Sequence, residues 1–194
     1  MKSQLRTGVL AFLMVLAIAS CTQQSEYDKL VERELASNVR QDSLFLGITM
    51  DMNRKEFYAH CWDLNKKGVF TNGVGNMSIK YDLENELKFP ASMQFYPKFG
   101  EDKIFEMPVD FQYNDWALWN KDMSNEVLLE DVKNMLEKWY GGGSFMEVVS
   151  EDGNQKILVK VDGNRRIRLW KRNVSTVRVI FTDLIDLQKL KEAS

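Results

Sequence analysis

The stretch from residue 103 to residue 113 reads KIFEMPVDFQY and predicts a long β-strand with one buried face. Apolar side chains recur at every second position of this stretch, at Phe105, Met107, Val109, Phe111 and Tyr113. Polar side chains lie between them, at Glu106, Asp110 and Gln112. Such alternation is typical of a sheet with one buried and one wet face, and it favours antiparallel pairing.

The residues before this strand show the same alternation, after a well-marked helix. Met77, Ile79 and Tyr81 alternate with polar residues, and so do apolar residues from 87 to 95. Pro90 and Pro108 interrupt the runs, and because proline lacks an amide donor we expect both at edges, bulges or outward positions.

Two helices are indicated by their capping residues. Asn53 and Glu56 have the spacing of a capping box and predict a helix from 53 to about 66. Ser124 precedes an apolar stripe with helical spacing, and the glycines at 141–143 end it. A thinner stripe at residues 27–35 predicts a further helix near the N-terminus.

The C-terminal third repeats the pattern of strands and turns. Asp152-Gly153 and Asp162-Gly163 are hairpin signals between apolar runs. A last apolar run, 177–181, precedes a short helix over 184–190. A helix followed by about four antiparallel strands therefore occurs twice. We predict an α+β fold of two tandem units, residues 43–114 and 115–194.

The halves resemble the helix-plus-meander units of the beta-lactamase inhibitor protein (BLIP) fold and of SmpA/OmlA-type outer-membrane assembly lipoproteins. The resemblance rests on topology and on Leu46-Gly47-Ile48, which is similar to the glycine-led helix entry of those units. The sequence departs from the pattern at 50–52, where Met-Asp-Met replaces the usual glycine before the cap.

The first twenty residues have the plan of a secretory signal peptide. Lys2 and Arg6 precede an apolar run over 8–19, which ends in the small residues Ala19 and Ser20. The run is too short to span a bilayer comfortably, since a helix needs about 20 apolar residues. We therefore predict a signal that is removed.

Residues 16–21, Leu-Ala-Ile-Ala-Ser-Cys, resemble the lipobox of bacterial lipoproteins. The resemblance implies that the Cys21 thiol receives a diacylglycerol, that the signal is cut before it, and that the new amine is acylated with a fatty acid such as palmitate. Several chains on one residue make attachment effectively permanent. The alternative is a secreted protein with a coincidental cysteine. Residues 21–42 then form a lipidated tether and helix.

The compartment follows from the same segment. A lipidated protein belongs to the bacterial cell envelope, and residues 22–24, Thr-Gln-Gln, lack the acidic cluster that resembles a surface-export tag. An outer-membrane anchor facing the periplasm is therefore preferred. The whole chain, especially 43–65, also resembles uncharacterised lipoproteins of Bacteroidota, a resemblance that implies no activity.

Composition excludes two classes of protein. A hydrophobic fraction of 44% with 11% aromatic residues is not that of a disordered chain. The net charge of −2 becomes −4 once Lys2 and Arg6 are removed with the signal. Nucleic-acid-binding proteins are usually strongly basic, so no nucleic-acid partner is predicted.

Chemistry-bearing residues are sparse. His60 and Cys61 are adjacent, and neighbours on a helix point about 100° apart, so no metal site is predicted. With Cys21 lipidated, Cys61 has no disulfide partner and is interpreted as a core thiol, with a reactive thiol or an intermolecular disulfide as alternatives. The glycines at 141–143 follow a helix rather than precede one, which argues against a phosphate loop. We predict no catalytic residues, no cofactor and no enzymatic activity.

Two surface features are candidate binding sites. One strand carries Arg166, Arg168, Trp170 and Arg172 on one face, and Arg178 joins them from the next strand. Guanidinium groups beside an indole suit phosphate, carboxylate or an acidic protein patch, whereas the alternative is a solvated face balanced by acidic neighbours.

The second feature is the tryptophan pair Trp116 and Trp119 between the halves, which would anchor an interface if exposed. The function predicted from these features is a non-enzymatic binding or scaffolding module for another envelope protein. A small-ligand or glycan-binding lipoprotein is the alternative, and it would need a concave aromatic-lined pocket. An envelope hydrolase ranks last.

Overall fold

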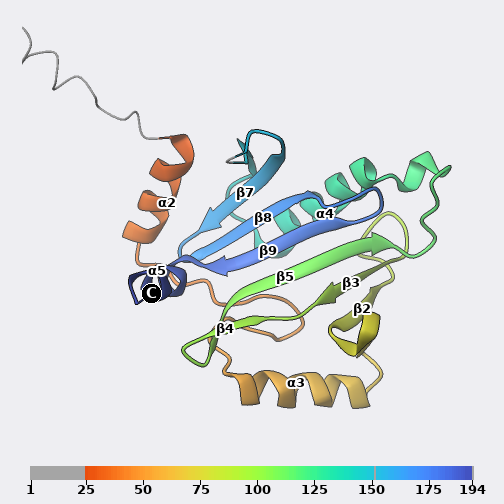
Figure 1. Ribbon diagram of the computed structural model, residues 1–194, viewed down its shortest axis with the longest axis horizontal. Coiled ribbons are helices and arrows are strands. Elements are labelled where there is room, and N and C mark those ends of the chain that lie inside the picture. Colours follow the sequence, from red (N-terminus) through yellow and green to blue (C-terminus); the bar gives the residue numbers. More distant parts are fainter. Residues whose placement is uncertain (1–24, 151, 194) are drawn as a thin grey trace, which may run out of the picture.

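A computed structural model describes residues 25–150 and 152–193. The predicted signal peptide at 1–20 and the predicted lipidation site Cys21 lie outside the described residues. Within the described part the fold is mixed α+β, with four α-helices and one antiparallel sheet of nine strands (Figure 1). The predicted α+β class is confirmed.

The helices and strands have the following bounds. The α-helices are α2 (Glu26–Ala36), α3 (Arg54–Lys66), α4 (Asn125–Tyr140) and α5 (Leu184–Glu192), and the short 3₁₀ helices are η1 (Val74–Asn76) and η2 (Lys121–Met123). The first strands are β1 (Thr71–Asn72), β2 (Ile79–Leu83), β3 (Ala91–Phe95), β4 (Lys98–Gly100) and β5 (Lys103–Tyr113). The remaining strands are β6 (Met146–Val149), β7 (Lys156–Asp162), β8 (Arg165–Lys171) and β9 (Val177–Asp183).

The strands form a single sheet in the order β1-β2-β3-β5-β9-β8-β7-β6, and β4 pairs with the first part of β5. β5 and β9 lie side by side at its centre, with Val109 opposite Val179 and Phe111 opposite Val177. Pro108 lies on the outward face, between the residues of β5 that pair with β3 and those that pair with β4. Its missing amide therefore falls at a break in that ladder, as expected for proline.

The helix ends follow the capping signals in the sequence. The Asn53 side chain accepts a hydrogen bond from the Glu56 amide while the Glu56 carboxylate accepts one from the Asn53 amide, which completes the capping box. The Ser124 side chain caps α4, and Gly141, with a φ of 58°, ends it in a conformation that favours glycine.

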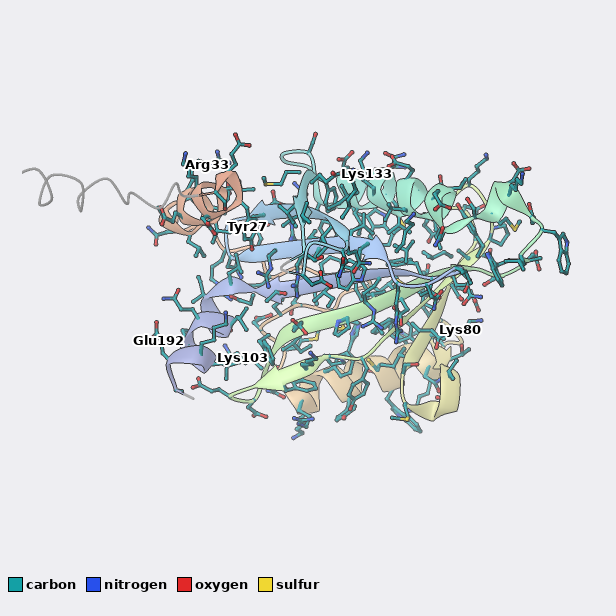
Figure 2. All side chains as sticks on the ribbon, turned by 45° about the horizontal axis from the view of Figure 1, so that its top comes forward. Tyr27, Arg33, Lys80, Lys103, Lys133 and Glu192 are labelled. Carbon is teal, nitrogen blue, oxygen red and sulfur yellow. The ribbon has the colours of Figure 1, made fainter. Side chains whose placement is uncertain are left out.

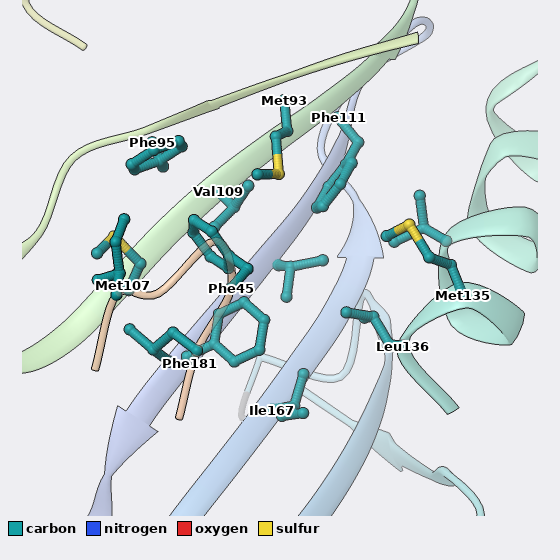
Figure 3. Close-up of a cluster of buried hydrophobic side chains, with 14 of the residues drawn as sticks. Phe45, Met93, Phe95, Met107, Val109, Phe111, Met135, Leu136, Ile167 and Phe181 are labelled. Carbon is teal, nitrogen blue, oxygen red and sulfur yellow. The ribbon is translucent and has the colours of Figure 1, made fainter. Parts of the chain in front are cut away.

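One face of the sheet carries the main core. Met107, Val109, Phe111 and Tyr113 of β5 are at most 1% exposed. They pack with the inward side chains of β3, β8 and β9, with α3 and α4, and with the loop over 44–50 (Figure 3). The core is continuous from the α3 side of the sheet to the α4 side.

The opposite face is covered only in part. Tyr27, Leu30, Val31 and Leu35 of α2 pack on Val159 and Val161 of β7 and on Leu184 of α5. The thin apolar stripe of α2 thus packs on the domain, but on the face opposite to α3 and α4. The rest of this outer face, over β5, β9 and β8, carries mainly polar and charged side chains, with Pro108, Trp170 and Ile180 among them.

The alternation predicted for the quoted strand holds from 107 to 113 and is wrong at Phe105. Phe105 is only partly buried, whereas Ile104 is fully buried. The reason is a β-bulge: Lys98 pairs with Glu106 but Phe99 pairs with Ile104, so β5 carries one extra residue there. The bulge turns Ile104 inward.

Among residues 25–150 and 152–193, none of the helices combines the length and the apolar character needed to cross a bilayer.

Substitution of the central strand tests the assignment of its two faces. Phe111→Ala should lower the free energy of unfolding by about 3 to 5 kcal/mol, because it leaves a cavity between the sheet and α4. The adjacent Gln112→Ala, on the exposed outer face, should change it by less than about 0.5 kcal/mol. Chemical denaturation followed by circular dichroism measures both, and equal losses would contradict the assignment.

Candidate functional site

The most distinctive surface feature is a groove of about 560 Å³ between α3 and the sheet edge formed by β1 and β2. We call it the aromatic groove. Its lining consists of Tyr58, Ala59, Cys61, Trp62, Asn65, Phe70, Thr71, Asn72, Met77, Ser78, Ile79 and Tyr96. These residues come from α3, from the segment over 70–79 and from the residue that follows β3.

Helical spacing on α3 produces one wall of the groove. Phe57 and Cys61 face the core, whereas Tyr58 and Trp62, each one residue further along, are 45% and 61% exposed. The Tyr58 and Tyr96 hydroxyls hydrogen bond to each other across the end of the groove. This bond, with burial, raises the pKa of Tyr96. The Tyr96 phenol therefore stays neutral at neutral pH, and the bond between the two hydroxyls holds both rings in place.

The opposite wall depends on the turn at η1. Gly75 has a φ of 64°, which lets the chain turn back sharply before β2. Met77 follows this turn and is 81% exposed. It was predicted to alternate within a strand, but β2 begins only at Ile79. Met77 is thus a projecting apolar side chain at the rim rather than part of the core.

Several polar groups of the groove are engaged within the protein, whereas Thr71 and Asn72 are exposed. The Asn65 amide donates to the Phe70 carbonyl oxygen at 3.0 Å, and the Ser78 hydroxyl donates to the side chain of Gln94 at 3.2 Å. Together with the paired tyrosine hydroxyls, these groups offer little to orient a polar ligand. What the groove presents outward is mainly apolar and aromatic surface.

The contacts of His60 and Cys61 are those of residues with a structural role. The His60 Nε2 atom lies 2.8 Å from the Leu46 carbonyl oxygen, which ties α3 to the preceding loop. Cys61 is 8% exposed at the floor of the aromatic groove, and burial raises its pKa to about 12. Among the described residues, no group of three or more histidine, cysteine, aspartate or glutamate side chains could hold a metal ion.

The predicted arginine cluster is brought together on the outer face of the sheet. Arg166, Arg168 and Trp170 share that face of β8, and Arg178 of β9 lies directly opposite Trp170. Arg172 lies just beyond the end of β8, and its guanidinium still reaches this face.

Acidic residues of β5 balance part of this charge. Asp110 accepts hydrogen bonds from both Arg172 and Arg178, the latter at 2.7 Å from Nη2 to Oδ2. Among the described residues, Arg168 has a single, long ion pair, with 3.8 Å between its Nη2 atom and Glu106 Oε2. The end of the cluster near Asp110 is therefore a paired, solvated face, while the end near α2 carries less compensated charge.

The two tryptophans of the predicted pair, Trp116 and Trp119, differ in their burial. Trp116 packs partly buried against the core, whereas Trp119 is 86% exposed, next to Leu118, which is 76% exposed. The connection that carries them lies at the end of the molecule opposite α2 (Figure 1). Tyr58 and Trp62 of α3 were not predicted to form a binding surface. Their spacing of four residues was the available signal.

A buried polar cluster explains the glycines after α4. The Lys160 ammonium is almost fully buried and donates to the Gly143 carbonyl oxygen and to Asp162, both at 2.8 Å. A Cβ atom on Gly142 would lie 2.7 Å from the Asp162 carboxylate. The run over 141–143 thus combines helix termination with a close approach to β7, and it follows α4 as expected.

Comparison with known proteins gives no further guide: no family model, no curated protein and no solved structure matches this chain.

The reactivity of Cys61 tests its place in the groove floor. In the Cys21→Ser variant, Cys61 is the only thiol of the chain. At pH 8 its raised pKa leaves very little thiolate, so reaction with Ellman's reagent should be at least about a hundredfold slower than in denaturant. Absorbance at the released thiolate's wavelength measures both rates. Similar rates in the two conditions would contradict burial and favour the reactive-thiol alternative.

Proposed function

We propose that this protein is a membrane-anchored lipoprotein of the bacterial cell envelope that acts as a non-enzymatic binding module for another envelope protein. The anchor is inferred from the lipobox-like residues 16–21, with lipid on Cys21. The binding surface we infer is the aromatic groove. The observation that carries the proposal is its exposed apolar rim.

That rim consists of side chains that a monomer normally buries. Tyr58, Trp62, Met77 and Tyr96 are between 40% and 81% exposed and all line one groove. Contiguous apolar surface of this kind marks interaction sites in soluble domains, and tryptophan and tyrosine are enriched among the residues that dominate binding energy. Trp62 is therefore the strongest candidate for an anchor of the interface.

The state of the polar groups favours a protein partner over a small ligand. A ligand pocket fixes orientation with a few convergent polar groups, but Asn65, Ser78 and the two tyrosine hydroxyls are engaged within the protein. A protein segment needs fewer such groups because it buries apolar side chains. The aromatic groove also suits a glycan or another small ligand, and binding of such a ligand stays the second candidate function.

The position of the groove fits presentation from a membrane. α2, which follows the predicted tether, lies at one end of the long axis, and η1 with β2 lies toward the other end (Figure 1). Lys80 of β2 and Tyr27 of α2 mark these two ends in Figure 2. A tether at the α2 end would leave the groove directed away from the bilayer.

The proposed architecture is that of two tandem units, 43–114 and 115–194, similar in plan to BLIP-like halves. Supporting it, the first segment contributes α3 with β1 to β5, and the second contributes α4 with β6 to β9. The two sets of strands join only where β5 pairs with β9. Each segment thus brings one long helix to the shared core face.

The anchor can be tested directly. The native protein should partition into the detergent phase of a Triton X-114 separation, and its N-terminal peptide should carry the mass of a diacylglyceryl, acylated Cys21. The Cys21→Ser variant should move to the aqueous phase, because the modified sulfur is removed. An unmodified N-terminus in the native protein would refute the anchor.

The groove is tested by comparing two exposed tryptophans. Trp62→Ala should weaken capture of the envelope partner about 30-fold or more, because an anchor residue contributes at least about 2 kcal/mol. Trp119→Ala removes an equally large exposed side chain far from the groove and should leave capture unchanged. Crosslinking in intact cells, tagged purification and quantitative mass spectrometry measure both.

The pattern of losses decides between the candidate surfaces. Loss of partner capture with Trp119→Ala alone would place the interface at the connection between β5 and α4. No partner above background for the wild-type protein, together with saturable binding of an envelope glycan that Trp62→Ala abolishes, would favour the second candidate. Retention of the same partner by both variants would refute the groove as its binding site.

A further inference from the structure

A second groove, of about 950 Å³, lies between the start of α2 and the outer face of β6, β7 and β8. We call it the anchor groove. Its lining consists of Ser25, Glu26, Tyr27, Asp28, Met146, Glu147, Val148, Val149, Ser150, Asp152, Ile157, Val159, Arg166 and Arg168. It therefore combines an apolar strip from β6 and β7 with two arginines from β8 and several carboxylates from the rim.

The two arginines carry charge that the protein compensates only in part. The Arg166 Nη1 atom donates to the Tyr27 hydroxyl at 3.0 Å, which is a neutral partner. Arg168 has its nearest carboxylate at 3.8 Å, on Glu106. The Nε atoms of both arginines are buried and have no hydrogen-bond partner among the described residues. Burial, followed by the charge of Arg166, lowers the pKa of Arg168. An anion over this pair would relieve that repulsion.

The rim carries the opposite charge. Glu26 and Asp28 line the groove from α2, and Glu147 and Asp152 line it from β6 and the turn after it. Glu147 is paired with Lys156, but Glu26 has no ion pair among the described residues. A bare anion would meet these carboxylates as it approached the arginines. A group that carries a phosphate and an ammonium together would satisfy both sets of charges.

The length of the tether places this groove near the membrane. Ser25 lines the groove and lies four residues after Cys21, so an extended chain separates the two by at most roughly 14 Å. The headgroup region of one leaflet is about 5 to 7 Å thick. With lipid on Cys21, the anchor groove must lie close to the headgroups, whereas the aromatic groove is carried away from them.

We propose that the anchor groove binds the zwitterionic headgroup of a phosphoethanolamine lipid of the membrane that holds the anchor. Arg166 and Arg168 bind the phosphate, carboxylates of the rim such as Glu26 bind the ammonium, and the apolar strip at Val148 and Ile157 contacts the glycerol region. This proposal rests on the lipid anchor but not on the aromatic groove. It assigns the outer sheet face a role in orienting the folded body.

The test uses the purified lipidated protein in phosphatidylethanolamine vesicles with a trace of photoreactive phosphatidylethanolamine. The diazirine of the probe lies in the acyl chain next to the glycerol, so the headgroup keeps its ammonium. After irradiation, peptides that contain 25–28 and 146–150 should carry the crosslinks. Arg166→Gln/Arg168→Gln should reduce their yield at least about fivefold, since it removes both proposed ligands of the lipid phosphate.

A matched control removes the same charge from the same end of the molecule. Lys29→Gln/Arg33→Gln changes two exposed cations on α2 that do not line the groove, and its yield should equal that of the wild type. Soluble glycerophosphoethanolamine at millimolar concentration should lower the wild-type yield, a measurement that needs no variant. Vesicle flotation is followed in every sample.

Each outcome decides the proposal. A floating protein whose groove peptides do not crosslink, or crosslink equally in the arginine variant, refutes headgroup binding and leaves the anchor intact. A probe with an anionic phosphatidylglycerol headgroup that crosslinks as well as or better than phosphatidylethanolamine refutes the zwitterionic assignment. A protein that does not float refutes the anchor and the headgroup site with it.

Discussion

β5 and β9 pair over six residues each, and this ladder joins the strands that precede α4 to those that follow it. The inward positions of the ladder are apolar in both strands, with Met107 opposite Phe181 and Val109 opposite Val179. Burying such pairs must offset the entropy of closing a loop of about 70 residues, which grows only slowly with loop length. Because the ladder places α3 and α4 on the same face, it makes one core of what would otherwise be two small ones.

The same ladder arranges the charges of the other face. Asp110 lies opposite Arg178 because Phe111 lies opposite Val177, so the register that buries the apolar side chains also pairs the charged ones. Nearer to α2 the next outward positions of β5 and β9 are Pro108 and Ile180, which carry no charge. Arg168, beside Ile180, consequently lacks the close carboxylate that Arg178 has. The uneven charge compensation of the arginine cluster is thus a consequence of the register of β5, β9 and β8.

Local signals in the sequence were enough to predict most elements. The capping box at Asn53 and the cap at Ser124 depend on residues three apart, and their helices begin where the sequence indicates. The bulge at Phe105 could not be predicted, because it depends on how β4 pairs with β5. The face of the sheet on which α2 packs is likewise a tertiary property, since its apolar stripe fits either face.

The candidate sites show the same limit. The alternation from Arg166 to Trp170 was sufficient to place the arginines on one face, but their ion pairs come from β5, about 60 residues away. The aromatic groove requires α3, η1 and the end of β3 to meet, so Trp62 and Met77 gave no joint signal in the sequence. The exposed fraction of a side chain decides whether Trp116 or Trp119 is available to a partner. It could not be predicted from the sequence either.

The two grooves differ in the kind of binding that their surroundings allow. The anchor groove is within reach of Cys21, so a weak ligand site there acts at the high local concentration that a tether imposes, and modest charge pairing is sufficient. The aromatic groove has no such advantage if it faces away from the bilayer, and it must obtain its binding energy from buried apolar area around Trp62 and Met77. The anchor groove, near the tether, can therefore bind through charged side chains. The aromatic groove, away from the tether, must bind through aromatic and apolar ones. With the proposed lipid anchor at one end, the first groove would orient the protein and the second would bind its partner.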